Sequence, residues 1–188
     1  MATRSTGGTG SRGGSGTKNA KKRGARRTSR SEARAHLLEA ARQVEVPARC
    51  DVCVVGGGAS GLVAAIVSAE AGAQTLVLER APEPGRTILA TGNGRCNFGT
   101  MQLSPSHYNQ PAFVEAAASA NWTDEVLAFF RASGLFWDLE DARLYPASRQ
   151  AASVRHVLLA RARRAGVTFA CAREVTAVSP GADGLAVR

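Results

Sequence analysis

Three glycines, Gly56, Gly58 and Gly61, stand at the spacing G-x-G-x-x-G between a short apolar run and a segment with helical periodicity. The first allows a tight turn, the second lets the backbone approach a pyrophosphate without an intervening Cβ, and the third permits close helix–strand packing. Free N–H groups at the helix start, together with the helix dipole, favour a phosphate there. The spacing predicts a phosphate-binding turn, and a glycine-rich turn that only joins two packed elements is the alternative.

A carboxylate at the end of the next apolar run completes the pattern. Glu79 follows Gly61 by 18 residues, where an acidic side chain accepts hydrogen bonds from the two hydroxyls of an adenosine ribose. Such a group disfavours a ribose 2′-phosphate, although Arg80 beside it weakens that discrimination. Turn, helix and acid together predict dinucleotide binding, but they do not separate FAD from NAD.

A βα unit is needed to hold these residues. The apolar run 50–55 fits a strand buried on both faces of a parallel sheet, and 59–71 fits a helix whose apolar stripe packs on that sheet. Residues 75–79 fit the second strand. Elsewhere we expect helices at 112–119, 124–133 and 150–165, strands at 167–171 and 174–179, and a loop-like stretch at 80–110. Another apolar run starts at 184–188.

Two longer segments point to one cofactor by resemblance. Residues 51–62 with Glu79 resemble flavoproteins of the glutathione reductase type. Residues 84–97 (PGRTILATGNGRCN) resemble the signature of the BaiN/RdsA-type FAD-dependent oxidoreductases, the aminoacetone oxidase-like flavoproteins. Residues 143–148 (RLYPAS) resemble a second segment of that family, so the resemblance spans about 50–188.

The resemblance implies a bound FAD, with its pyrophosphate at 56–61, its ribose at Glu79, its adenine beside the backbone of Val175, and the loop 91–97 near the flavin. Two glycines let that loop approach a flat ring, and its Asn and Arg side chains offer donors for ring carbonyls or phosphates. The implied cofactor-binding residues are Gly56, Gly58, Ala59, Ser60, Gly61, Glu79, Arg80, Gly85, Arg86, Thr91, Gly92, Asn93, Gly94, Arg95, Cys96, Asn97 and Val175.

Three positions depart from the residues common in that family. Thr87 stands in place of Lys, which we expect to alter the electrostatics around the flavin. Tyr145 in place of Phe and Ala142 in place of Gly are expected to be tolerated. The flavin would transfer hydride or electrons on a small-molecule substrate, with NAD(P)H as a candidate electron donor and with the catalytic residues unassigned.

The net charge of +9 is unevenly distributed. Residues 1–30 hold nine Lys or Arg and no acid, so the other 158 residues carry 15 basic and 15 acidic groups. Seven glycines and almost no apolar side chains predict a disordered basic tail. Weak, nonspecific contact with polyanions is the most we expect of it, since no aromatic residue stands before Phe98 to stack on bases, and we expect no specific nucleic-acid partner.

Composition also bears on compartment and metals. No apolar stretch approaches the ~18 residues of a membrane span, and the first 30 residues lack the apolar core of a signal peptide. We therefore expect no membrane partner, a cytoplasmic location, free thiols and no metal. Cys50 and Cys53 fall inside the predicted first strand, where odd spacing sends their side chains to opposite faces and supports neither a zinc site nor a dithiol. For Cys96, a buried thiol is preferred over a redox role.

The chain is therefore predicted to be α/β, with a Rossmann-like FAD-binding parallel sheet carrying helical insertions. Its parts are a disordered tail (1–30), a helix and linker (31–48, the helix at 31–44 capped by Ser31), and the N-terminal part of the FAD-binding domain (49–188). We expect that domain to be incomplete at its C-terminus, so that the 188 residues alone retain FAD weakly and do not turn over. The oligomeric state stays open. An NAD-binding dehydrogenase fragment, or a non-catalytic fragment with a polyanion-binding tail, are the alternatives.

Overall fold

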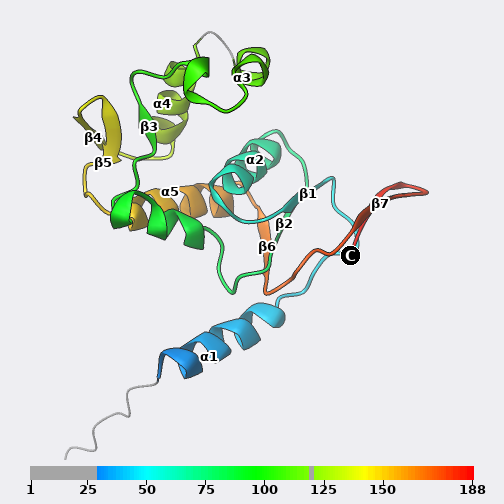
Figure 1. The fold of residues 1–188 in the computed structure, drawn as a ribbon. Helices are drawn as coiled ribbons and strands as arrows, with labels where there is room; N and C mark the ends of the chain where they lie inside the picture. The colour runs from blue at the N-terminus through cyan, green and yellow to red at the C-terminus, as the bar shows by residue number, and fades with distance from the viewer. Residues whose placement is uncertain (1–28, 119–120) are drawn as a thin grey trace, which may run out of the picture.

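The computed structural model describes residues 29–118 and 121–188, so nearly all of the predicted tail lies outside the described residues. A three-stranded parallel sheet carries two helices, and a smaller antiparallel lobe stands beside them (Figure 1). In chain order the elements are α1 (Arg30–Arg42), β1 (Val52–Val55), α2 (Ala59–Glu70), β2 (Thr75–Glu79), η1 (Arg86–Gly94), β3 (Gly99–Thr100), η2 (Pro105–His107), α3 (Pro111–Ala117), α4 (Trp122–Ala132), β4 (Trp137–Glu140), β5 (Arg143–Pro146), α5 (Ala151–Arg164), β6 (Thr168–Cys171), β7 (Val178–Gly181) and β8 (Gly184–Val187).

The parallel sheet has the order β1-β2-β6. β2 lies in the middle, where Val77 faces Val54 on one side and Phe169 on the other. The expectation that the first strand is buried on both faces is wrong, since its residues are only half-buried and Val55 is 54% exposed. The reason is that α2 and α5 both pack on one face of the sheet, which leaves the other face of β1 without a covering helix among the described residues.

Two helices cover the sheet and form most of its core. Because the strand order follows the chain order, right-handed crossovers place α2 and α5 on the same face, where they contact each other. The predicted apolar stripe of α2 is confirmed, with Leu62 and Ile66 fully buried. Val154 and Leu158 of α5 join the same cluster. Each such side chain contributes about 1.5–3 kcal/mol through burial.

The stretch 80–110, predicted to be loop-like, contains ordered elements. η1 packs along α5 and buries Ile88. The glycines and prolines of this stretch suggested a loop, but left-handed backbone at Gly92 and Asn93 (φ +55° and +53°) lets the short helix kink instead of ending. β3 and η2 follow, and β3 joins the second sheet.

The second sheet is antiparallel, with the order β3-β5-β4, and its hairpin was missing from the sequence prediction. Asp141 and Ala142 connect β4 to β5 with positive φ at both positions (+49° and +64°). That is the backbone of a two-residue turn, which Asn-Gly or Asp-Gly usually provides. Asp-Ala is an uncommon pair there, so the turn carried no recognisable signal.

Three predicted helix starts shift by a residue or two. The cap of α1 is Ser29 and not Ser31: the Ser29 Oγ accepts from the Glu32 N–H at 3.1 Å, and Glu32 Oε2 accepts from the Ser29 N–H at 2.8 Å. This reciprocal capping box satisfies two otherwise unpaired donors. The helix predicted from 124 begins at Trp122, and the one predicted at 112–119 spans Pro111–Ala117.

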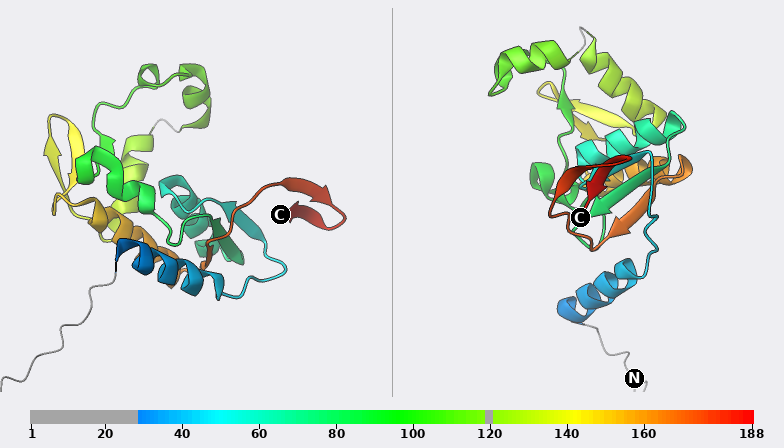
Figure 2. Two further views of the ribbon diagram at one scale, coloured as in Figure 1. Left: turned by 60° about the horizontal axis from the view of Figure 1, so that its bottom comes forward. Right: turned by 90° about the vertical axis from the view of Figure 1, so that its right-hand side faces the viewer.

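The predicted strand 174–179 is also wrong. Residues 172–177 form no strand, and the chain pairs only from Val178, where β7 and β8 make an antiparallel hairpin that projects from the body (Figure 2). Ion pairing between Arg49 and Asp183 at 2.9 Å joins this hairpin to the linker before β1. Residues 172–177 therefore form a connecting segment that leads the chain away from the parallel sheet and into the β7–β8 hairpin.

Candidate nucleotide-binding site

The glycine turn has the backbone geometry that its spacing predicted. Gly56 has φ +95° and donates its N–H to the carbonyl of Leu78 at 2.8 Å, which ties the turn to β2. A Cβ at Gly61 would lie 2.0 Å from the Gly56 carbonyl oxygen, so only glycine fits there. At Gly58, the N-cap residue of α2, the nearest atom to such a Cβ is Thr87 Oγ1 at 3.7 Å. Gly56 and Gly61 are thus required by the fold, and Gly58 is not.

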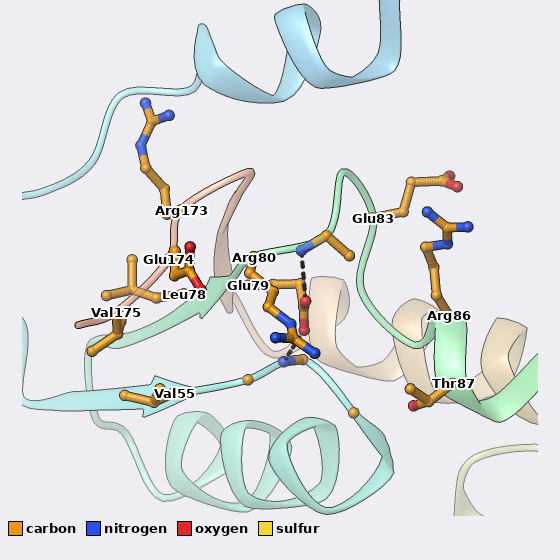
Figure 3. Close-up of a pocket in the computed structure, with 14 residues that line it drawn as sticks. Val55, Leu78, Glu79, Arg80, Glu83, Arg86, Thr87, Arg173, Glu174 and Val175 are labelled. Atoms are coloured by element: carbon orange, nitrogen blue, oxygen red, sulfur yellow. Dashed lines mark hydrogen bonds between the residues drawn. The ribbon is translucent and has the colours of Figure 1, made fainter. Parts of the chain in front are cut away.

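Glu79 points into this turn. Its Oε2 accepts from the Gly57 N–H at 2.6 Å and its Oε1 accepts from the Ala81 N–H at 2.7 Å (Figure 3). Two backbone donors fix the carboxylate, and each oxygen keeps a further lone pair for a hydroxyl group. The acid and the glycine turn form one unit, as a ribose and diphosphate site requires.

A cavity of about 430 Å³ opens in front of this unit at the carboxyl ends of the parallel strands. Its two ends differ in chemistry: Val55, Leu78 and Val175 lie at one end, and Arg86 and Thr87 lie at the other (Figure 3). The full lining consists of Val55, Gly56, Gly57, Gly58, Leu78, Glu79, Arg80, Ala81, Glu83, Arg86, Thr87, Arg173, Glu174 and Val175. Arg173 and Glu174 also lie at the Val175 end, and Glu83 lies beside Arg86 (Figure 3). The apolar side chains, the Glu79 carboxylate and Arg86 follow one another in the order of base, ribose and phosphate.

Half of the six charged side chains that line the cavity are paired with other described residues. Besides Glu79, Glu83 pairs with Arg155 at 3.5 Å, and the Arg173 guanidinium donates to the Arg42 carbonyl at 2.7 Å. Arg80 and Arg86, by contrast, form no hydrogen bond or ion pair with another described residue. Arg80 extends from the end of β2 toward the glycine turn, whereas the side chain of Arg86, at the start of η1, extends toward Glu83 (Figure 3). The guanidinium groups of these two residues are therefore available to bind an anion in the cavity.

Six of the predicted cofactor-binding residues line the cavity: Gly56, Gly58, Glu79, Arg80, Arg86 and Val175. Three more belong to the supporting structure, because Ala59 and Ser60 form the first turn of α2 and Gly61 packs beneath the turn. Gly85 lies behind the cavity, where its N–H donates to the Gly57 carbonyl at 2.6 Å. The other predicted residues lie outside the lining, in the last turn of η1 and just after it: Thr91, Gly92, Asn93, Gly94, Arg95, Cys96 and Asn97.

Sequence reasoning missed part of the lining, above all Arg173 and Glu174. They follow β6, and since all three parallel strands end at the same edge, residues just after a strand belong to the site. That rule was available for β6, whose end was predicted correctly. Thr87 was noted as a departure from a family pattern, and in the structure it lines the cavity beside Gly58.

The four cysteines are free thiols. The prediction of opposite faces for Cys50 and Cys53 is wrong: a bend at Asp51 places Cys50 before the strand, and its thiol contacts that of Cys53. Burial, then the neighbouring Cys50, raises the pKa of the Cys53 thiol. Burial, followed by the charges of Glu79 and Glu83, raises the pKa of the Cys171 thiol to about 11.

Cys96 is buried (6% exposed) and packs in the hydrophobic core, which agrees with the preference for a buried thiol. Within residues 29–118 and 121–188, no group of His, Cys, Asp and Glu side chains has the arrangement of a metal site. In the same ranges, no helix is both long enough and apolar enough to cross a bilayer.

Parallel strands, a glycine turn leading into α2, and an acid at the end of β2 define a Rossmann-like α/β domain. The chain belongs to the family described as the HI0933-like protein Rossmann domain, whose model matches residues 50–188. This confirms the family resemblance of residues 84–97 and 143–148.

Several known proteins are similar to this chain. A 3-dehydro-bile acid delta(4,6)-reductase from Clostridium scindens is 40% identical over 139 residues, which is 72% of this chain and 34% of that protein. A ribosomal RNA dihydrouridine synthase from Escherichia coli is 26% identical over 138 residues, again 72% and 34%. The chain thus spans about a third of the length of these curated relatives.

One solved structure shows the likeness in fold. The 3-ketosteroid-delta4-(5alpha)-dehydrogenase from Rhodococcus jostii aligns with a TM-score of 0.52 at 18% identity, over 78% of this chain and 43% of that one.

Proposed function

We propose that residues 50–188 bind the ADP half of FAD and form part of an FAD-dependent oxidoreductase. One observation carries the proposal: the Glu79 carboxylate, fixed by the Gly57 and Ala81 amides, and the open space at Gly58 face the same cavity. A ribose and a diphosphate need this pair of features side by side. The name of the 40% identical relative, a reductase, supports an oxidoreductase.

The chain's own residues have separable roles in this proposal. The amides at the start of α2, with Arg80 and Arg86, bind the diphosphate, and Glu79 accepts hydrogen bonds from the ribose hydroxyls. Val55, Leu78 and the backbone of Val175 exclude water from the adenine. When bound, the cofactor supplies hydride or electron transfer. A small-molecule substrate, and NAD(P)H as electron donor, complete the proposed reaction.

Titration calorimetry with four ligands tests this function. We expect ADP and FAD to bind the 188-residue chain, because both carry the adenosine diphosphate that the cavity fits. FMN carries the same flavin ring without adenosine and serves as the control that does not bind. NAD binding more tightly than FAD would favour the alternative, a nicotinamide-dependent dehydrogenase. A chain that binds neither ADP nor FAD would overturn the proposal.

A further inference from the structure

This inference rests on the proposed function and concerns what holds the glycine turn in place. Gly57, within the turn, uses both of its backbone polar groups: its N–H donates to Glu79 Oε2 at 2.6 Å, and its carbonyl accepts from the Gly85 N–H at 2.6 Å. A Cβ at Gly57 would lie 2.9 Å from Pro84 Cβ, so residues 84–85 also pack against the turn. The position of the turn, and of the amides that follow it, therefore depends on where residues 84–85 lie.

An arginine from α5 holds residues 84–85. Arg155 Nε donates to the Pro84 carbonyl at 2.9 Å, and Arg155 Nη2 lies 3.5 Å from Glu83 Oε1. A Cβ at Gly85 would lie 2.9 Å from Arg155 Cγ and 3.4 Å from its Cδ, so the methylene stem of the arginine covers the glycine. Gly85 has φ +72°, a backbone conformation that glycine adopts readily. Arg155 thus contacts three consecutive residues by an ion pair, a hydrogen bond and packing.

Arg155 is not among the residues that line the cavity, and its side chain is only 20% exposed. The helix that carries it is anchored on both sides of this position, because Val154 and Leu158 are buried in the core. A series of contacts therefore runs from the buried face of α5 through residues 84–85 to Gly57. Through this series, a residue outside the cavity fixes the backbone inside it.

We propose that Arg155 is a positioning residue for the diphosphate: it holds residues 84–85 where they orient the glycine turn, and so it sets the affinity of the site for ADP. Backbone amides bind a phosphate well only when they converge on it, and a hydrogen bond weakens steeply when its donor is misaligned. Glu79 depends less on Arg155, because the Ala81 N–H holds its other oxygen at 2.7 Å. The effect of Arg155 should therefore fall on the diphosphate and not on the adenosine.

The charge of Arg155 offers a different explanation, since a cation near the cavity attracts phosphate without positioning any backbone. A change at Gly85 separates the two explanations. Gly85→Ala keeps the charge of Arg155 but would place a Cβ 2.9 Å from Arg155 Cγ, so the arginine and residues 84–85 cannot keep their contact. If positioning is the cause, this variant should lose ADP affinity as replacement of the arginine does.

The test measures dissociation constants for ADP and adenosine by titration calorimetry. The proteins are the parent 188-residue chain, Arg155→Met, Gly85→Ala and the double variant, and methionine keeps both the length of the stem and a high helix propensity. We expect each single variant to bind ADP about tenfold more weakly than the parent and adenosine about equally well. The double variant should bind ADP about as weakly as either single variant, because both changes disrupt one contact. Arg163→Met, exposed on the same helix, is the control and should leave both affinities unchanged.

Three results would overturn the inference and leave the ADP site standing. Arg155→Met could bind ADP as tightly as the parent, or it could lose adenosine affinity to the same extent as ADP affinity, which would indicate a general structural role. The two losses could also add up to about a hundredfold in the double variant, which would indicate that the charge of Arg155 acts by itself. Should Arg155→Met fail to fold, an unchanged ADP affinity in Gly85→Ala overturns the inference. If the parent chain does not bind ADP, the proposed function itself fails.

Discussion

Arg161 on α5 donates two parallel hydrogen bonds to Glu70 at the end of α2, from Nε to Oε1 at 2.7 Å and from Nη2 to Oε2 at 2.8 Å. Its Nη1 also donates to the Phe129 carbonyl at 2.9 Å and to Ser133 Oγ at 3.0 Å, and the guanidinium lies over the Phe129 ring. One side chain thus joins α5, α2 and the C-terminal end of α4. Since α2 begins at the glycine turn, the contact fixes the far end of the helix that carries the site.

Replacing Arg161 should destabilise the domain. Arg161→Ala removes the bidentate pair and the bonds to α4, and because its side chain is only 15% exposed we expect a loss of about 1–3 kcal/mol in the free energy of unfolding. Urea denaturation measures it. Arg163→Ala, on the exposed side of the same helix, is the matched control and should change stability by no more than about 0.5 kcal/mol. Equal effects of the two variants would contradict the role of Arg161.

The Glu70–Arg161 pair should also make stability depend on pH. Hydrogen bonding from Arg161, the largest cause, lowers the pKa of Glu70 below its ordinary value, with the charges of Arg161 and Arg164 acting in the same direction. A lowered folded-state pKa stabilises the fold above the unfolded-state pKa, and this stabilisation is lost as pH falls through the folded-state pKa.

The parent should therefore exceed Glu70→Gln in unfolding free energy at about pH 7, and the difference should shrink toward about pH 3. Because Glu70 is partly exposed, we expect the difference at neutral pH to be below about 1 kcal/mol. A difference that stays constant across this range would show that the ionised carboxylate does not matter.

Gly58→Ala should weaken ADP binding with little effect on stability, whereas Gly61→Ala should lower the stability of the fold. The Cβ of Gly58→Ala meets nothing closer than Thr87 Oγ1 at 3.7 Å, so thermal stability should stay nearly unchanged while ADP affinity falls at least about tenfold. The Cβ of Gly61→Ala would lie 2.0 Å from a backbone oxygen and should cost about 3 kcal/mol or more of stability. Melting curves with and without ADP measure both. Unchanged ADP affinity in Gly58→Ala would remove the phosphate from this turn.

The glycine turn, α2, β2 and its terminal acid could be predicted because each depends on contacts within 30 residues of sequence. The strand Thr75–Glu79 agrees at both ends with the sequence prediction, and Leu62 and Ile66 are buried as their spacing indicated. The lining contributed by Arg173 and Glu174 comes from about 100 residues later in the chain. It follows only once the pairing of β6 with β2 is known.

Other elements were missed because tertiary contacts outweigh local signals. Pro84, Gly92 and Gly94 are typical of a loop, yet η1 forms because Ile88 packs against α5. The β4–β5 turn uses Asp141-Ala142 with positive φ, which no single residue there favours. Cys50 meets Cys53 because Asp51 bends the chain before the strand starts, a shift of two residues that reverses the predicted direction of one side chain.

Arg80 and Arg86 line the cavity from different elements without a partner among the described residues, and they should recognise charge rather than adenine. We expect Arg80→Gln and Arg86→Gln each to weaken ADP binding about tenfold, AMP binding less, and adenosine binding not at all, because the interaction grows with the number of phosphate charges. Both variants should also flatten the dependence of ADP affinity on salt concentration. Arg163→Gln, remote from the cavity on α5, is the control and should leave all three affinities unchanged. If adenosine binding fell as much as ADP binding, these arginines would shape the cavity instead of pairing with the diphosphate.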